Sequence, residues 1–185
     1  RRLNRRQNQR DVLYANPYTG DPRPVLTEKN NRYISEDFLD AFTFLDDGKF
    51  VINSEKDGWS HLYLYDKQGF ELGQITKGKF DVTEFYGYDA VKKVFYYQAA
   101  AESPLRREVY FVSLDGKKSG KISTLKGTNR VVFSKNFKYY INYFSNSQTP
   151  DLITLHENSK GMQIRVLQDN TVLKNTLKLF QIPQK

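Results

Sequence analysis

The sequence predicts an all-β protein: a partial β-propeller of about three four-stranded antiparallel blades plus half a blade, with a short C-terminal helix. Aromatic residues make up 15% of the 185-residue chain, and this bias favours strands over helices. An apolar strand, a glycine turn and a second short strand recur four times along the chain. The turn glycines Gly20, Gly69, Gly116 and Gly161 lie 49, 47 and 45 residues apart. Periods of this size are typical of propeller blades.

The clearest repeat covers residues 41–77. Its first half, Ala41–Asn53, has two apolar runs joined by Asp46-Asp47-Gly48-Lys49, and an Asp-Gly pair between such runs is a strong hairpin signal. Its second half, Ser54–Thr76, contains a loop with Trp59, a strand at 61–65 and the Gly69 turn into a third strand. Together the halves predict four strands, which is the size of one blade.

The same pattern continues along the chain. Hairpins with turns at 89–93 and 135–138 each precede a strand, glycine turn and strand. We therefore expect a half blade at 1–30, blades at 41–77, 84–125 and 131–167, and a connector at 168–185. In the connector, Val172, Leu173, Leu177 and Phe180 have helical spacing and predict a short amphipathic helix on the propeller rim. An ordinary antiparallel sandwich with short strands is the alternative fold.

Composition excludes several classes of function. The chain has no cysteine, which rules out disulfides, thiolate catalysis and cysteine metal sites. No run of 18 apolar residues is present, so we expect no membrane span, and no signal-peptide pattern is visible. The net charge is +8, and Arg1, Arg2, Arg5, Arg6 and Arg10 form the most basic stretch. Because no aromatic residue occurs before Tyr14, this stretch predicts a solvated strand pair and no nucleic-acid partner.

Few residues suggest chemistry. His61 and His156 are the only histidines, and we expect both to be surface side chains at strand ends. Two histidines without cysteine do not favour a tetrahedral zinc site. Asp46 and Asp47 precede Gly48 in a predicted turn, where aspartate is favoured by its local backbone bonds, so a turn role is expected over acid–base chemistry. We predict no catalytic, metal-binding or cofactor-binding residue. The loops at 102–107 (E-S-P-L-R-R) and 126–129 (K-G-T-N) carry no assigned role.

A set of motifs resembles a known family. The motifs occur in order and in register over nearly the whole chain, and the most informative are Ser54–Asp66, Gln74–Thr83, Ala101–Pro104, Val109–Gly116, Phe133–Ile141 and Arg165–Asn170. Together they resemble the β-propeller of dipeptidyl peptidase IV, in the prolyl oligopeptidase family of serine peptidases. The resemblance implies a parent enzyme that removes dipeptides from peptide N-termini after proline or alanine. In such an enzyme the propeller gates access and assists peptide binding.

The resemblance also implies that catalysis lies outside this chain. The family's nucleophile sits in a G-x-S-x-G elbow, whereas Gly116–Gly120 reads G-K-K-S-G and lacks the spacing. A hydrolase domain is therefore expected to follow Lys185. The family's paired glutamates, which hold the substrate amino terminus, would lie earlier in the propeller.

The family places substrate-facing residues just before the hairpin that corresponds to 41–53. Here the matching stretch is Ser35–Asp40, in which Phe38 is the one candidate to face substrate. The resemblance implies a peptide substrate and no cofactor. The missing cysteines point to a bacterial member located in the periplasm or cell envelope.

Two further expectations concern interactions. A stand-alone propeller-like protein-interaction module is the rival hypothesis, and a nucleophile elbow encoded downstream would decide for the enzyme. Unpaired blade edges predict self-association of the chain. Some inner-face aromatics among Phe133, Tyr139, Tyr140 and Tyr143 are expected to be exposed.

Overall fold

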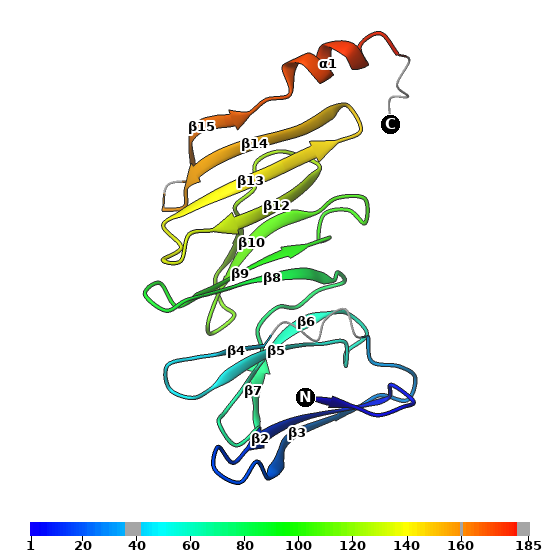
Figure 1. Cartoon of the computed structure of the whole chain (residues 1–185), viewed down its shortest axis with the longest axis vertical. Coiled ribbons are helices and arrows are strands. Elements are labelled where there is room, and N and C mark those ends of the chain that lie inside the picture. Colours follow the sequence, from blue (N-terminus) through cyan, green and yellow to red (C-terminus); the bar gives the residue numbers. More distant parts are fainter. Residues whose placement is uncertain (36–41, 160, 181–185) are drawn as a thin grey trace. The chain divides into compact units, whose positions relative to one another are not determined.

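The computed structural model describes residues 1–35, 42–159 and 161–180, which form two compact units (Figure 1). The first unit comprises residues 1–77 and the second residues 78–185. Within the described ranges all the sheets are antiparallel, three of them with four strands and one with three. No helix in these ranges is long and apolar enough to cross a membrane.

The first unit holds two sheets. The N-terminal sheet has the order β1-β2-β3 and the next sheet the order β4-β5-β6-β7. Their strands are β1 (Arg2–Leu3), β2 (Gln9–Ala15), β3 (Pro22–Lys29), β4 (Phe42–Phe44), β5 (Phe50–Ser54), β6 (His61–Tyr65) and β7 (Glu71–Gln74). The second sheet is a meander in which each strand pairs with its neighbours in sequence, as in a propeller blade.

The turns of the first unit follow the residue types that predicted them. Gly48 has φ 79° and donates its N–H to the Leu45 carbonyl at 3.0 Å. Strand β1 has only two residues, because the Asn4 side chain caps a turn directly after it. Its Oδ1 accepts the N–H groups of Asn8 and Gln9 at 3.0 and 3.1 Å, and Gln7 adopts a left-handed φ of 52°.

The second unit also holds two sheets, with the orders β11-β10-β9-β8 and β12-β13-β14-β15. Their strands are β8 (Val82–Asp89), β9 (Val94–Ala99), β10 (Glu108–Ser113), β11 (Ser119–Lys121), β12 (Thr128–Phe133), β13 (Tyr139–Asn146), β14 (Thr149–Glu157) and β15 (Met162–Gln168), followed by helix α1 (Thr171–Leu177). Strands β8 and β12 begin two and three residues before the repeat boundaries expected at 84 and 131.

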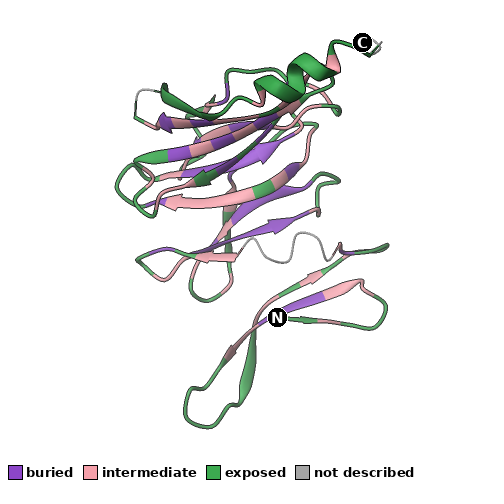
Figure 2. Ribbon diagram, turned by 45° about the horizontal axis from the view of Figure 1, so that its top comes forward, coloured by how far each residue is buried: buried purple, intermediate pink, exposed green. Residues whose placement is uncertain are grey.

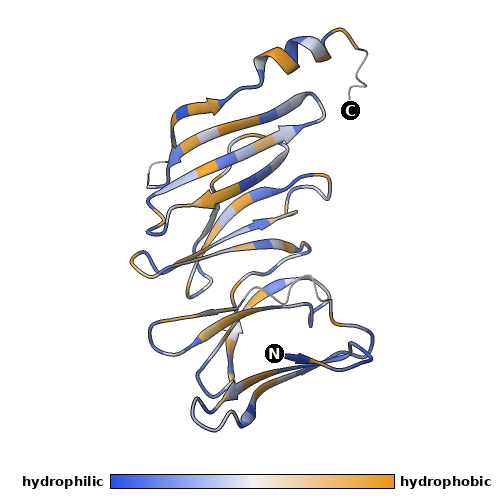
Figure 3. Ribbon diagram, viewed as in Figure 1, coloured by the Kyte–Doolittle hydropathy of each residue, from blue (hydrophilic) through white to orange (hydrophobic). Residues whose placement is uncertain are grey.

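Each unit is held together by the packing of its two sheets. In the first unit Phe50, Ile52, Tyr63 and Tyr65 form a buried cluster against which Val25 and Leu26 of β3 pack. In the second unit Val109 of β10 packs with Val131 and Tyr140 of the following sheet. Hydrophobic and hydrophilic residues alternate along the strands (Figure 3), which places one face of a sheet in the core.

The C-terminal elements bury little. All seven residues of β15 are exposed, and α1 has no buried residue (Figure 2). The predicted helix is therefore present, but it merely contacts β14, and of its apolar side only Leu177 is half-buried. Val172 and Leu173 are exposed, and Phe180 lies beyond the helix. Leu177 is the last residue of the helix. The N–H groups of Leu179 and Phe180 donate to the carbonyls of Thr176 and Leu177, which are turn bonds and do not continue the helix.

The inner-face aromatics are only partly exposed. Tyr140, expected among the exposed candidates, is buried against Val109 and stacks on His156, whereas Tyr139 is exposed. The two residues alternate because successive side chains of a strand point to opposite faces. The exposed apolar residues gather instead on β15, at Met162, Ile164, Val166 and Leu167.

Candidate functional site

The predicted substrate-facing residue, Phe38, lies in segment 36–41, outside the described residues. The structure does describe residues 30–35, through which the chain leads from β3 to this segment. Ile34 is buried, and its N–H donates to the Gln7 carbonyl at 2.7 Å. The N–H of Asn30 donates to the Asn8 carbonyl at 3.0 Å. The residues just before the Ser35–Asp40 stretch are thus fixed to the turn between β1 and β2 by backbone hydrogen bonds.

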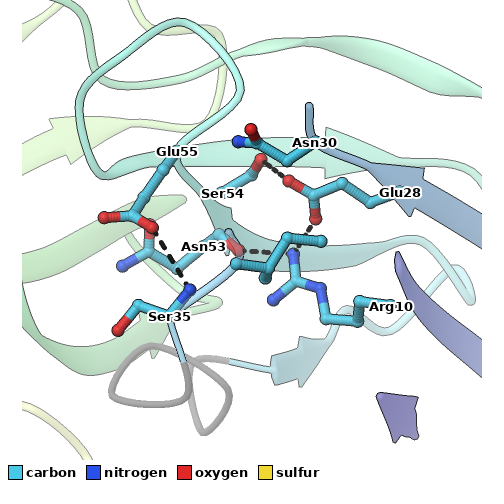
Figure 4. A pocket seen from close by; sticks show the side chains of 8 residues that line it. Arg10, Glu28, Asn30, Ser35, Asn53, Ser54 and Glu55 are labelled. Atoms are coloured by element: carbon cyan, nitrogen blue, oxygen red, sulfur yellow. Dashed lines mark hydrogen bonds and ion pairs between the residues drawn. The ribbon is translucent and has the colours of Figure 1, made fainter. Parts of the chain in front are cut away.

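A buried polar cluster lies beside this connection (Figure 4). Arg10 of β2 and Glu28 of β3 are opposite each other in the sheet and form an ion pair, with the Arg10 side chain 4% exposed and that of Glu28 12%. The Arg10 guanidinium also donates to the Asn53 carbonyl at 2.8 Å, and the Ser54 hydroxyl donates to the second oxygen of Glu28. We call Arg10, Glu28, Asn53 and Ser54 the Arg10 cluster. It ties the N-terminal sheet to strand β5.

The residue that follows the cluster in sequence contacts the connection itself. The N–H of Ser35 donates to Glu55 Oε2 at 3.4 Å, and Glu55 follows Ser54 directly. Ile34 and Ser35 line a cavity of about 10 Å³ together with Arg10 and Glu28. That volume is about the size needed for a single water molecule, so it cannot hold a peptide. The Arg10 cluster therefore packs beside residues 34–35 without forming a binding pocket, and the hydrogen bonds that hold these two residues come from Gln7 and Glu55.

Strands β5 and β6 place Ser54 opposite His61, which are the residue types of a hydrolytic pair. Their side chains form hydrogen bonds with other residues of the first unit. Ser54 donates to Glu28, while His61 Nδ1 lies 3.0 Å from Thr76 Oγ1, which in turn accepts the N–H of Leu62 at 3.0 Å. His61 is 0% exposed. The prediction of a surface histidine is wrong here because the segment ending at Thr76 folds back over the start of β6.

His156 is also buried, again contrary to the expectation of a surface side chain. Strand β14 continues through Glu157 and pairs on both sides, so His156 lies inside a strand and not after it. Its ring stacks on Tyr140 with centroids 4.7 Å apart, and Nε2 lies 2.8 Å from Thr154 Oγ1. Burial lowers the pKa of His156 below its ordinary value, because the apolar surroundings disfavour the charged form.

The two aspartates before Gly48 form a turn, as predicted. The Asp47 carboxylate accepts the Lys49 N–H at 3.2 Å and forms an ion pair with the Lys49 ammonium group. The hydrogen bond from the Lys49 side chain lowers the pKa of Asp47. The bonds between Asp47 and Lys49 within the turn explain why aspartate precedes Gly48, without any role in acid–base chemistry.

The basic N-terminal stretch is not uniformly solvated. Arg1, Arg5 and Arg6 are exposed, but Arg10 is buried in the cluster described above. Arg2 donates to Asp11 Oδ2 at 2.8 Å, and this hydrogen bond is the main cause that lowers the pKa of Asp11. The prediction of a solvated strand pair was wrong for Arg10, because its side chain points to the face of β2 that packs on β5.

Sequence reasoning did not single out Arg10 and Glu28 as a pair. A signal was nevertheless present in the hairpin, since the turn at 16–21 sets the register of β2 and β3. A register shift between Val12 and Leu13 then makes residue 10 face residue 28 instead of residue 27, and this brings the opposite charges together. Only the packing of the next sheet shows that the pair is buried.

Comparison with known proteins identifies the family of this chain. The family model described as the dipeptidyl peptidase IV (DPP IV) N-terminal region matches residues 1–151. The crystal structure of Porphyromonas gingivalis dipeptidyl peptidase 4 superposes with a TM-score of 0.90 at 40% sequence identity, over 97% of this chain and 25% of that one.

Curated relatives are more distant. Dipeptidyl peptidase 4 of Arthroderma otae and that of Trichophyton rubrum are each 27% identical over 139 residues, which is 73% of this chain. The chain spans about a fifth of the length of these curated relatives, 18% in each case. The structural match confirms the predicted all-β, partial-propeller architecture. The chain belongs to the family of the dipeptidyl peptidase IV N-terminal region.

Proposed function

We propose that this chain is the non-catalytic β-propeller segment of a dipeptidyl peptidase IV-like serine exopeptidase. The parent enzyme would release N-terminal dipeptides after proline or alanine. The observation that carries the proposal is the match to Porphyromonas gingivalis dipeptidyl peptidase 4, which extends over 97% of this chain at 40% identity. Because the match covers a quarter of that protein, the activity itself would reside in further parts of the parent.

The role of this segment would be to gate access and to assist peptide binding. The hydrogen bonds from Ile34 to Gln7 and from Ser35 to Glu55 support this role, because they hold residues 34–35, where the stretch that contains Phe38 begins. We propose that Phe38 faces the substrate, from a segment whose first residue, Ser35, is held by Glu55. Pre-positioning of this kind lowers the ordering cost of binding.

The chemistry would come from a hydrolase domain. No G-x-S-x-G elbow occurs within residues 1–185, and residues 168–185 would connect the propeller to that domain. We propose a bacterial member located in the periplasm or cell envelope. The identity to a Porphyromonas gingivalis protein and the absence of cysteine support this assignment.

The chain taken alone would also self-associate. The exposed apolar residues of β15 support this, since apolar patches and unpaired strand edges both favour association. The same edge would serve a stand-alone protein-interaction module, which is the second candidate function.

Hydrolysis of a glycyl-prolyl p-nitroanilide distinguishes the two functions. The protein expressed from the complete reading frame is compared with residues 1–185 alone. We expect turnover by the former and none by the latter, because residues 1–185 contain no nucleophile elbow. Failure of the complete protein to hydrolyse either glycyl-prolyl or alanyl-prolyl substrates would favour the interaction module.

A further inference from the structure

The second unit contains a surface pocket that belongs to none of the features above. It has a volume of about 560 Å³ and lies where the loops at 102–107 and 126–129 meet the turn between β13 and β14. Its wall includes the cations Arg106 and Lys126 and the hydroxyls of Ser103, Thr128 and Ser145. We call it the Arg106 pocket. We propose that it binds a carboxylate-bearing segment of a peptide.

The walls of the pocket are fixed by backbone hydrogen bonds. The N–H of Arg107 donates to the Gly127 carbonyl at 3.0 Å, and the N–H of Asn129 donates to the Arg107 carbonyl at 2.7 Å. The buried Asn129 side chain bridges both loops, donating to the carbonyls of Arg107 and Leu125 at 3.3 and 3.0 Å. The two loops therefore form one pre-organised wall, which reduces the ordering cost of binding.

Gly127 shows how closely the end of β13 approaches the loop at 126–129. A Cβ atom at this position would lie 2.5 Å from the Ser145 carbonyl oxygen and 2.8 Å from the Phe144 ring. Only glycine lets the K-G-T-N loop lie against the end of β13 at this distance. The loop glycine that sequence analysis left without a role is thus what closes the pocket.

The charge of the pocket selects an anion. Of the described residues that line it, none is acidic, and neither cationic side chain makes an ion pair or hydrogen bond with a described residue. The nearby Glu102 is bound by Lys121 at 2.5 Å, and that hydrogen bond is the first cause of its lowered pKa, with Arg106 contributing more weakly through its charge. Two cations that form no ion pair with the described residues thus line one polar pocket.

The other lining groups favour a peptide over a free phosphate. The planar guanidinium of Arg106 can bind a carboxylate or a phosphate in a two-point hydrogen bond, so the remaining lining groups decide between the two. Serine and threonine hydroxyls can both donate to and accept from peptide groups. Leu105, 74% exposed, adds an apolar contact at the same wall. The choice of a peptide as ligand rests on the proposed function, whereas the anion preference rests on the pocket alone.

Binding is measured on residues 1–185 by NMR chemical-shift perturbation, so no turnover is required. The probe is the peptide Ala-Pro-Ala-Leu-Glu with a free C-terminus. Three matched peptides replace the glutamate by glutamine, amidate the C-terminus, or do both. We expect shifts at Thr128, Ser145 and the Arg106 backbone, and at least about tenfold weaker binding of the doubly neutral peptide. The singly neutral peptides show which carboxylate is recognised.

Two substitutions, Arg106→Gln and Lys126→Gln, should each weaken binding of the acidic peptide about tenfold. The matched control is Lys135→Gln, which removes an exposed cation in a turn of the same unit and should leave binding unchanged. Equal binding of the charged and neutral peptides would overturn the proposal, as would displacement of the peptide by inorganic phosphate at equal concentration. Either outcome is independent of whether the parent enzyme hydrolyses its substrate.

Discussion

Removal of the Glu28 carboxylate should destabilise the first unit strongly. In the variant Glu28→Ala the Arg10 guanidinium, 4% exposed, loses its carboxylate partner while it remains buried. Leaving one member of a buried ion pair without its partner costs about 3–5 kcal/mol. The Ser54 hydroxyl loses its acceptor in the same variant. We therefore expect a loss that is a large part of the total stability of a small domain.

Urea unfolding followed by tryptophan fluorescence measures this effect. Trp59 is the only tryptophan of the chain and lies in the first unit, so its emission reports on that unit. With an m-value of about 1–3 kcal/mol per molar urea, the midpoint should fall by roughly 2 M. Should Glu28→Ala not fold, Glu28→Gln retains an acceptor oxygen and should show a smaller shift in the same direction.

A double variant separates charge from packing. The pair Arg10→Met with Glu28→Met replaces the buried ions by apolar side chains, and such replacements are often neutral or stabilising. It should therefore be more stable than Glu28→Ala. The control is the exposed pair, in which Asp47→Asn should change the midpoint little because exposed pairs contribute little. Equal midpoints for Glu28→Ala and Asp47→Asn would refute the view that the Arg10 cluster ties the N-terminal sheet to β5 through a buried ion pair.

Three further predictions concern other parts of the chain. Gly69→Ala should destabilise the first unit by about 2 kcal/mol more than Gly20→Ala in the same urea assay. Both glycines have positive φ, but a Cβ at Gly69 would lie 1.9 Å from the Val25 oxygen, whereas nothing lies within 4 Å at Gly20. Equal losses of stability in the two variants would contradict the close approach at Gly69. The stability of the second unit should fall as the pH drops below about 6.5. The reason is that the pKa of His156 is lowered in the folded protein, so that the unfolded chain binds more protons in this range. An NMR titration of the His156 ring with a midpoint at or above 6.5 would show this prediction to be wrong. The double variant Ile164→Lys, Val166→Lys should reduce the self-association of residues 1–185, measured by light scattering over a concentration series. The control is Gln163→Lys on the same exposed strand. An unchanged molecular mass of the double variant would exclude β15 as the contact.

The fold was largely predictable because its signals are local. Period-2 patterns, Asp-Gly turns and regularly spaced glycines each depend on a few neighbouring residues, and the turns at Gly48 and Gly69 formed as expected. Burial was less predictable, because it depends on which sheet covers which face. His61, His156 and Arg10 were all expected at the surface, and all three are covered by segments distant from them in sequence.

The site was predictable only in part. The resemblance pointed to Ser35–Asp40, and the structure describes the hydrogen bonds that lead into it. The Arg10 cluster beside them is a tertiary feature, since Arg10, Glu28 and Asn53 come from three strands. The Arg106 pocket likewise joins two loops that the sequence presents as separate, and the hydrogen bonds of Arg107 and Asn129 bring them together.

Labelling with a fluorophosphonate probe tests the central proposal most directly. Residues 1–185 and the protein from the complete reading frame are treated in parallel, and the labelled peptide is identified by mass spectrometry. Such probes react with an activated serine, which needs a base and an oxyanion hole beside it. We expect no labelling of residues 1–185, and labelling of the complete protein at one serine downstream of Lys185. Stoichiometric labelling of a serine within residues 1–185 would contradict the account of this chain as a non-catalytic propeller segment.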